Sequence, residues 1–249
     1  MSNYQENLSD RILEDYHKVE MIIQEKLGIP ICEWTEMDLI KDFHKSLYIY
    51  KELLSEITLA EDPKSYFLES LNGLMEFLWV ILCGKYRLSS MTLRGSMETY
   101  AKGLLIHLIG RSTDKFSNNI ESSFKNIVDQ ISTSQGLNRN KKDSLKKLMN
   151  QKFADKVKQE YWDLSDVVHS RETMFNACSE YIDDILSIVK EEELLILMMN
   201  KVNKILKYFI EILVISNYED LDNNMNYFIF KDIKNRLSDE FKEVNNIFI

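Results

Sequence analysis

Apolar residues recur at three- and four-residue steps along most of this 249-residue chain. This spacing gathers them on one face of an α-helix, because a helix completes one turn in about 3.6 residues. The apolar residues between 62 and 82 cover most of the helix circumference around Trp79, so this segment is expected near the centre of the bundle. The pattern predicts helices at about 9–27, 35–59, 62–82, 89–110, 112–131, 139–189, 191–216 and 232–245.

Residues that favour helix ends support these boundaries. The expected caps at the beginnings are Ser9 or Asp10, Thr35, Asp62 followed by Pro63, and Ser89 or Ser90, and those at the ends are Gly28 and Gly110. Between the helices, Ser132–Asn140 reads as a polar loop, and Met225–Phe230 reads as a short extended segment.

The sequence predicts an all-α fold, a bundle of long antiparallel helices. Only seven Gly and two Pro are present, fewer than the many turns of a β-sandwich or a doubly wound α/β fold require. No composition shift marks a domain boundary, so we expect one domain over residues 1–249. Its core is expected at about 62–190, with N-terminal helices at 8–60 and C-terminal helices at 191–249 packing on it.

Charge and cysteine usage narrow the functional classes. The net charge of −9 argues against a protein that coats nucleic acid over its whole surface, but it leaves room for a local basic groove. Three cysteines without a CxxC pair indicate neither a disulfide framework nor a zinc site. No apolar run is long enough to span a bilayer, and the first residues lack the pattern of a signal peptide. We expect a cytoplasmic protein without membrane contact.

The segment 158–171 carries the first candidate for chemistry. Tyr161, Ser165 and His169 follow one another at four-residue steps, which places them in one row on a helix. An imidazole can donate or accept a proton near neutral pH, so His169 is the candidate acid or base. The alternative is that His169 is a packing residue of an ordinary core helix.

A second row, Arg94, Glu98 and Lys102, lies on a helix that is otherwise largely apolar. Charges on such a helix favour an internal polar site, although a solvated face with weak ion pairs is the alternative. We expect Arg94 and Glu98 to approach Ser165 and His169 in one cleft.

A basic run directly precedes the His169 segment. Residues 139–158 contain eight Lys or Arg residues and two Asp residues, a large local excess in an acidic chain. Cations beside an acid or base suit a phosphate-bearing substrate, whereas the alternative is a soluble surface helix. The candidate substrate-binding residues are Lys102, Tyr161, Lys146, Lys147, Lys152 and Lys158.

Two motifs together resemble a known superfamily. Leu-Arg-Gly-Ser-Met-Glu-Thr-Tyr-Ala-Lys at 93–102 has an R-x-x-x-E pattern, and Tyr-Trp-Asp-Leu-Ser-Asp-Val-Val-His at 161–169 has a Y-x-x-L-S-x-x-V-H pattern. Over roughly Leu74 to Arg171 the chain resembles the HEPN-like superfamily of bacterial helical proteins, which includes abortive-infection proteins. The resemblance implies a metal-independent endoribonuclease that acts as a dimer in phage defence or as a toxin.

The chain departs from the superfamily pattern at one point. The usual motif has an Arg, often followed by Asn, four to six residues before the His on the same helix. His169 matches the family histidine, but Leu164 and Ser165 stand where Arg-Asn would be. Arg94 of the neighbouring helix is then the candidate for the missing cation, with Glu98 orienting it.

Two functional hypotheses follow. In the first, the chain is a HEPN-like, metal-independent ribonuclease or toxin-like effector, with His169, Arg94, Glu98 and Ser165 at its catalytic site. In the second, it is a non-catalytic helical module that binds a protein or a nucleotide. Neither hypothesis calls for a cofactor or a metal. The expected partners are RNA or a nucleotide, a protein partner or antitoxin, and a second copy of the chain.

Overall fold

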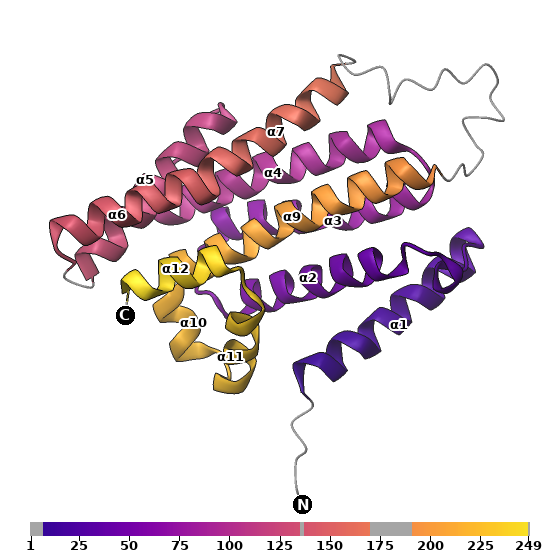
Figure 1. Ribbon diagram of the computed structural model, residues 1–249, viewed down its shortest axis with the longest axis horizontal. Helices are drawn as coiled ribbons and strands as arrows, with labels where there is room; N and C mark the ends of the chain where they lie inside the picture. The colour runs from indigo at the N-terminus through magenta and orange to yellow at the C-terminus, as the bar shows by residue number, and fades with distance from the viewer. Residues whose placement is uncertain (1–6, 135–136, 170–190, 249) are drawn as a thin grey trace, which may run out of the picture. The chain divides into compact units, whose positions relative to one another are not determined.

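The computed structural model describes residues 7–134, 137–169 and 191–248, and every regular element within them is helical (Figure 1). The first elements are α1 (Leu8–Leu27), a 3₁₀ turn η1 (Ile31–Glu33), α2 (Met37–Glu56), α3 (Glu61–Leu82) and α4 (Tyr86–Ile109). The next are α5 (Phe116–Ser134), α6 (Arg139–Met149), a π-helical turn η2 (Asn150–Ala154) and α7 (Asp155–Val168). The last are α9 (Glu192–Ser216), α10 (Tyr218–Asn224), α11 (Tyr227–Arg236) and α12 (Asp239–Phe248). The fold is the predicted all-α bundle.

Contacts within the chain group these elements into two compact units. Unit 1 comprises residues 1–57 and 202–237, and unit 2 comprises residues 58–201 and 238–249. The boundary therefore falls inside α9, and the C-terminal flank is divided between the units. The described part of the predicted core at 62–190 lies in unit 2. The predicted packing of both flanks on that core stays a prediction.

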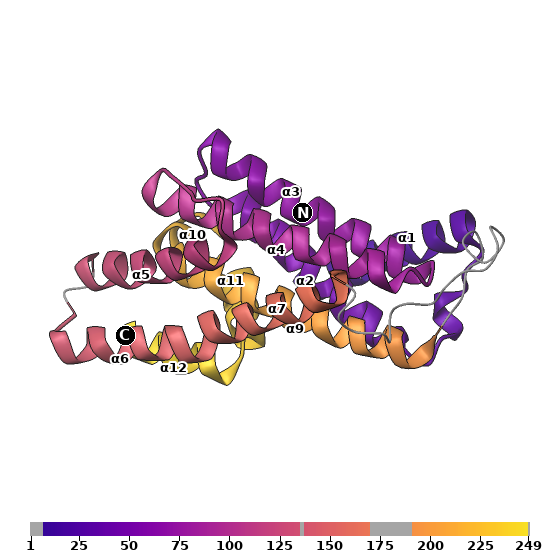
Figure 2. The same cartoon turned by 90° about the horizontal axis from the view of Figure 1, so that it is seen from above.

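In unit 2, α4 is the central helix. It packs along α3, to which a short turn joins it, and it also contacts α5 and α7 (Figures 1 and 2). Small residues allow the close approach of α3 and α4: a Cβ placed on Gly103 would lie 3.1 Å from Tyr66 Cβ and 3.2 Å from the Pro63 carbonyl oxygen. The ring of Tyr100 meets that of Phe67 edge-on, and both side chains are fully buried.

The helices α6 and α7 are joined through the π-helical turn, so that 139–168 is helical throughout. Leu145, Met149 and Phe153 bury the inner side of this stretch. Its outer contacts are ion pairs: Lys156 binds Glu240 of α12 at 2.7 Å. Lys201 of α9 lies 3.0 Å from Glu160 of α7. These pairs fix α7 in unit 2.

In unit 1, α1 lies against α2. Arg11 pairs with Glu52 at 2.9 Å, and His44 Nε2 lies 2.8 Å from the Asp15 carboxylate. The Tyr50 and Phe209 rings pack together within the core of this unit. No helix in the described ranges is both long and apolar enough to cross a membrane.

Several helices begin at residues other than the predicted caps. Asn7 caps α1, because its side chain accepts the backbone N–H of Ser9 at 2.8 Å, so the prediction of Ser9 or Asp10 was wrong. Ser89 and Ser90 are buried inside α4 and donate to the Tyr86 carbonyl, a local side-chain bond that competes with capping. Likewise α2 follows Glu36 rather than Thr35, and α3 follows Ala60 rather than Asp62.

Two further predictions were wrong. The apolar residues of α3 do not bury its whole circumference, as a place at the bundle centre would require: Phe77 and Leu78 face the core, but Trp79 is 43% exposed. The segment Met225–Phe230 is not extended: Asn226 caps α11, and its side chain accepts two backbone N–H groups. The ends predicted at Gly28 and Gly110 are confirmed, and both glycines have positive φ angles of 66° and 75°. The predicted helix over 170–189 lies outside the described residues.

Candidate functional site

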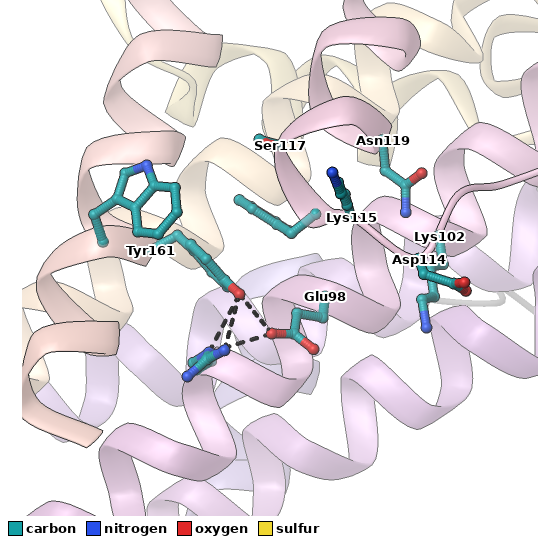
Figure 3. Close-up of a pocket in the computed structure, with 10 residues that line it drawn as sticks. Glu98, Lys102, Asp114, Lys115, Ser117, Asn119 and Tyr161 are labelled. Carbon is teal, nitrogen blue, oxygen red and sulfur yellow. Dashed lines mark hydrogen bonds and ion pairs between the residues drawn. The ribbon is translucent and has the colours of Figure 1, made fainter. Parts of the chain in front are cut away.

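A hydrogen-bonded group of three side chains joins α4 to α7 in unit 2. The Tyr161 hydroxyl donates to Oε1 of Glu98 at 2.7 Å and accepts from Nη2 of Arg94 at 3.1 Å. Arg94 Nε also donates to Oε1 of Glu98 at 3.2 Å, across one turn of α4. Figure 3 shows the Tyr161 hydroxyl directed toward the Glu98 carboxylate. Each group has two partners in the cluster, which holds the guanidinium in one orientation.

Phe116 and Arg94 both contact the ring of Tyr161. Phe116, the first residue of α5, stacks on it at a centroid distance of 4.0 Å. The Arg94 guanidinium carbon lies 5.1 Å from the ring centroid, within cation–π range. Burial of the phenol, with the hydrogen bond to Glu98, raises the pKa of Tyr161 against the opposing effect of Arg94. Tyr161 is therefore a neutral donor at physiological pH.

His169 stands at the C-terminal end of α7, with an exposed side chain. Its backbone N–H donates to the Ser165 carbonyl at 2.9 Å. Arg87 of α4 donates to the Val168 carbonyl at 3.1 Å and so secures this helix end. Nε2 of His169 lies 3.4 Å from Nη1 of Arg94. Because a guanidinium only donates, this contact requires the neutral imidazole with its proton on Nδ1.

A pocket of about 400 Å³ lies next to this cluster. It is lined by three cationic, two anionic and three aromatic side chains, together with Ser and Asn. The lining residues are Arg94, Glu98, Lys102, Asp114, Lys115, Phe116, Ser117, Asn119, Tyr161 and Trp162. Figure 3 shows Lys102 on α4 and Lys115 on the segment before α5. Within the described part of the chain, neither ammonium has an ion-pair partner.

The segment before α5 is shaped by Asn119, which is fully buried. Its side-chain oxygen accepts the Thr113 backbone N–H at 2.8 Å and the Thr113 hydroxyl at 2.7 Å. Its amide nitrogen donates to the Thr113 carbonyl at 2.8 Å. These three bonds fold the segment back on α5 and bring Asp114 and Lys115 to the pocket. The helix consequently begins at Phe116 and not at the predicted Ser112–Asp114.

The structure brings together most of the residues predicted for one cleft. Arg94, Glu98, Tyr161 and His169 form a continuous set of contacts, and Lys102 lines the adjoining pocket. Ser165 is buried in α7, and it does not line the pocket. Among the described residues, Ser165 contributes its backbone carbonyl, which accepts a hydrogen bond from the His169 backbone N–H.

The basic run does not meet the pocket. Lys146 and Lys147 are exposed on α6, and Lys152 is half-buried on the π-helical turn. Lys158 forms an ion pair with Glu121 of α5 at 2.6 Å, so a carboxylate of the protein already balances its charge. Among the described residues, none of these four lysines lines the pocket. Their predicted substrate contacts stay a prediction.

The sequence pattern did not indicate several residues of this site. Phe116, Lys115 and Asn119 had no chemical pattern of their own, and Arg87 lies outside the R-x-x-x-E motif. Trp162 offered the one available signal, an aromatic residue on the polar side of a helix next to Tyr161. It is 53% exposed at the pocket.

In the described ranges, no three His, Cys, Asp or Glu side chains converge in a way that could hold a metal ion. Cys32 and Cys83 are free thiols, and Cys178 lies outside the described residues. The site itself offers guanidinium, phenol, carboxylate and imidazole groups.

The chain matches no protein-family profile, no curated protein and no solved structure. The resemblance to HEPN-like proteins consequently rests on the two motifs quoted above.

Proposed function

We propose that the chain is a HEPN-like, metal-independent endoribonuclease that serves as a toxin-like effector in antiviral defence. The observation that supports this proposal is the contact between Arg94 and His169. The superfamily motif needs a cation beside its histidine, and this chain lacks that Arg on the histidine's own helix. A guanidinium supplied by α4, 3.4 Å from the imidazole, is chemically equivalent.

The proposed reaction is cleavage of RNA by its own 2′-hydroxyl. As substrate binds, Arg94 Nη1 turns from His169 Nε2 to the phosphate, and the freed Nε2 takes the 2′-hydroxyl proton as the 2′-oxygen attacks phosphorus. The bond from phosphorus to the 5′-oxygen breaks, which leaves a 2′,3′-cyclic phosphate and a 5′-hydroxyl that takes its proton from water. Arg94 stabilises the negative charge that develops on the phosphorane oxygens.

The other residues of the cluster act as positioning residues. Glu98 and Tyr161 accept three hydrogen bonds from the Arg94 guanidinium, one at the Glu98 carboxylate and two at the Tyr161 hydroxyl, which leaves Nη1 directed toward the imidazole. Ser165 helps to position His169 through its carbonyl, and Arg87 secures the same helix end. In this proposal the protein acts in the cytoplasm as a homodimer, with a protein antitoxin as the candidate regulator.

The test is cleavage of total RNA by purified protein with EDTA present. Wild type is expected to cleave, and His169→Ala is expected to lose about a hundred- to ten-thousandfold in rate. His17→Ala is the matched control, because the His17 side chain is 59% exposed on α1 in unit 1. Cleaved RNA should end in a 2′,3′-cyclic phosphate. Full activity in His169→Ala would refute the proposal.

A second function, a non-catalytic module that binds a nucleotide or a protein, is favoured by another observation. Arg94 is already engaged by Tyr161 and Glu98, and His169 does not line the adjoining pocket. Such a module would bind RNA or a nucleotide without cleaving it. The same assay separates the two functions, since binding without His169-dependent cleavage supports the module.

A further inference from the structure

We infer that the pocket beside Arg94 seats one unpaired nucleotide of the substrate RNA, with its base stacked on Trp162 and its phosphate on Lys102 and Lys115. The inference rests on the proposed function, since it names the form of RNA that the same site takes. Each part of the pocket supports a different feature of this nucleotide.

Trp162 supports the base. Its side chain is 53% exposed although α7 buries its apolar neighbours, and it lines the pocket. It meets the Tyr161 ring edge-on at 5.5 Å, and Tyr161 is in turn stacked on Phe116. An indole held in an edge-to-face pair and 53% exposed to solvent offers a surface on which a base can stack.

Lys102 and Lys115 support the phosphate. They reach the pocket from two elements, α4 and the segment that Asn119 folds back on α5. Neither is paired with a described carboxylate, so both charges are available. The lining carries one more cation than it has anions, counting Arg94, Lys102 and Lys115 against Glu98 and Asp114. This balance suits a single phosphate better than a run of them.

Arg94 connects this pocket to the proposed chemistry. It lines the pocket and also lies 3.4 Å from His169. A nucleotide in the pocket therefore adjoins the phosphate that Arg94 would stabilise. A base stacked on Trp162 cannot stay paired in a duplex, so the substrate at this point is single-stranded.

The experiment measures binding separately from cleavage. The ligand is a short 2′-O-methyl oligoribonucleotide, which lacks the attacking hydroxyl, compared with the same strand in a duplex. The protein carries Trp34→Phe and Trp79→Phe, so that its fluorescence reports on Trp162 alone. We expect quenching by the single strand and not by the duplex. With the natural tryptophans in place, Trp162→Ala should weaken binding about five- to a hundredfold.

Matched variants serve as controls. Trp79→Ala removes a tryptophan of similar exposure on α3, outside the pocket, and should leave affinity unchanged. Lys102→Ala with Lys115→Ala should reduce the slope of log affinity against log salt by about one. Lys125→Ala, an exposed lysine of α5 outside the pocket, should leave that slope unchanged.

The outcomes distinguish this inference from the proposed function. Quenching and Trp162-dependent binding without RNA cleavage would support the nucleotide pocket and refute the ribonuclease. Cleavage that depends on His169, with binding indifferent to Trp162→Ala, would support the ribonuclease and overturn the pocket. Equal affinity for single strand and duplex would also overturn it.

Discussion

Nη1 of Arg94 lies 3.4 Å from Nε2 of His169, although 75 residues separate the two in the chain. Each is held by groups that are not themselves proposed to react with substrate. Glu98 and Tyr161 orient the guanidinium, and Arg87 secures the helix end that carries the imidazole. Catalytic groups are most effective when their supporting contacts fix them before substrate arrives, so these contacts are the ones to test.

Replacing Arg94 by Lys keeps the positive charge but removes the fork of N–H donors. One ammonium group cannot hold Glu98, Tyr161 and His169 in the observed geometry. We expect RNA cleavage by Arg94→Lys to fall about a hundred- to a thousandfold, the effect typical of a lost transition-state donor. Single-turnover kinetics would measure it. Arg111→Lys, at an exposed position after α4, should cleave at the wild-type rate. Wild-type cleavage by Arg94→Lys would show that charge alone is sufficient.

Replacing Glu98 by Gln should lower the pKa of Tyr161. Burial raises this pKa most, and the hydrogen bond and negative charge of Glu98 raise it further. Removing the charge takes away part of the upward shift, while burial remains. The phenolate absorbance of Glu98→Gln, compared with the same variant carrying Tyr161→Phe, would give the titration of this one residue. An unchanged midpoint would mean that Glu98 does not act on the phenol.

Tyr16 in unit 1 makes stability fall at high pH. Burial, followed by the charge of Glu20, raises the pKa of Tyr16 to about 12. The folded state thus prefers the neutral phenol. This preference contributes fully below the ordinary tyrosine pKa of about 10 and is lost as pH rises toward the folded value. Tyr16→Phe should therefore flatten the loss of stability at alkaline pH, as urea midpoints at increasing pH would show.

At neutral pH the same substitution should leave the free energy of unfolding unchanged or raised. Among the described residues, the buried Tyr16 hydroxyl has no hydrogen-bond partner, so its removal relieves a desolvation cost. The control is Tyr227→Phe, because Tyr227 is 65% exposed. A steeper alkaline loss in Tyr16→Phe than in wild type would contradict the sign.

Two glycines of α4 should respond in opposite directions to alanine. A Cβ on Gly95 meets no atom within 4 Å, so Gly95→Ala should stabilise the helix by about 0.5–1 kcal/mol. A Cβ on Gly103 lies 3.1 Å from Tyr66 Cβ and 3.2 Å from the Pro63 carbonyl oxygen, so overpacking should cost about 1–3 kcal/mol. Urea unfolding of both variants would measure the difference. Equal effects would show that α3 and α4 can move apart freely.

Asn119→Ala should destabilise unit 2 by about 1–3 kcal/mol, because it removes the three hydrogen bonds that the fully buried Asn119 amide makes to Thr113. It should also weaken binding of single-stranded RNA, since Lys115 loses its support at the pocket. Asn118→Ala changes the exposed neighbour and should do neither. Chemical denaturation and RNA affinity, measured on the two variants together, would check the expectation.

The helical fold could be predicted from the chain because its cause is local. Apolar residues at three- and four-residue steps identify a helix without reference to any other element. The pattern over 191–216, for example, predicted the helix that the structure shows as α9. A glycine that must adopt a positive φ angle likewise marks a helix end at Gly110. Cap choice is less certain, because Asn7 competed successfully with Ser9, and two serines bonded within α4 instead of capping it.

The site required contacts between distant elements. The motifs singled out Arg94, Glu98, Tyr161 and His169, but their mutual distances depend on how α4 packs against α7. Trp79 and Trp162 show the same limit of sequence analysis. Both lie on amphipathic helices, so the local pattern does not tell which of them stands at the site. Burial depends on what the remaining helices cover, and no local pattern specifies that. Trp79 of α3 is exposed but lies outside the pocket. Trp162 is also exposed, but it lines the pocket beside Tyr161, on which Phe116 of α5 stacks.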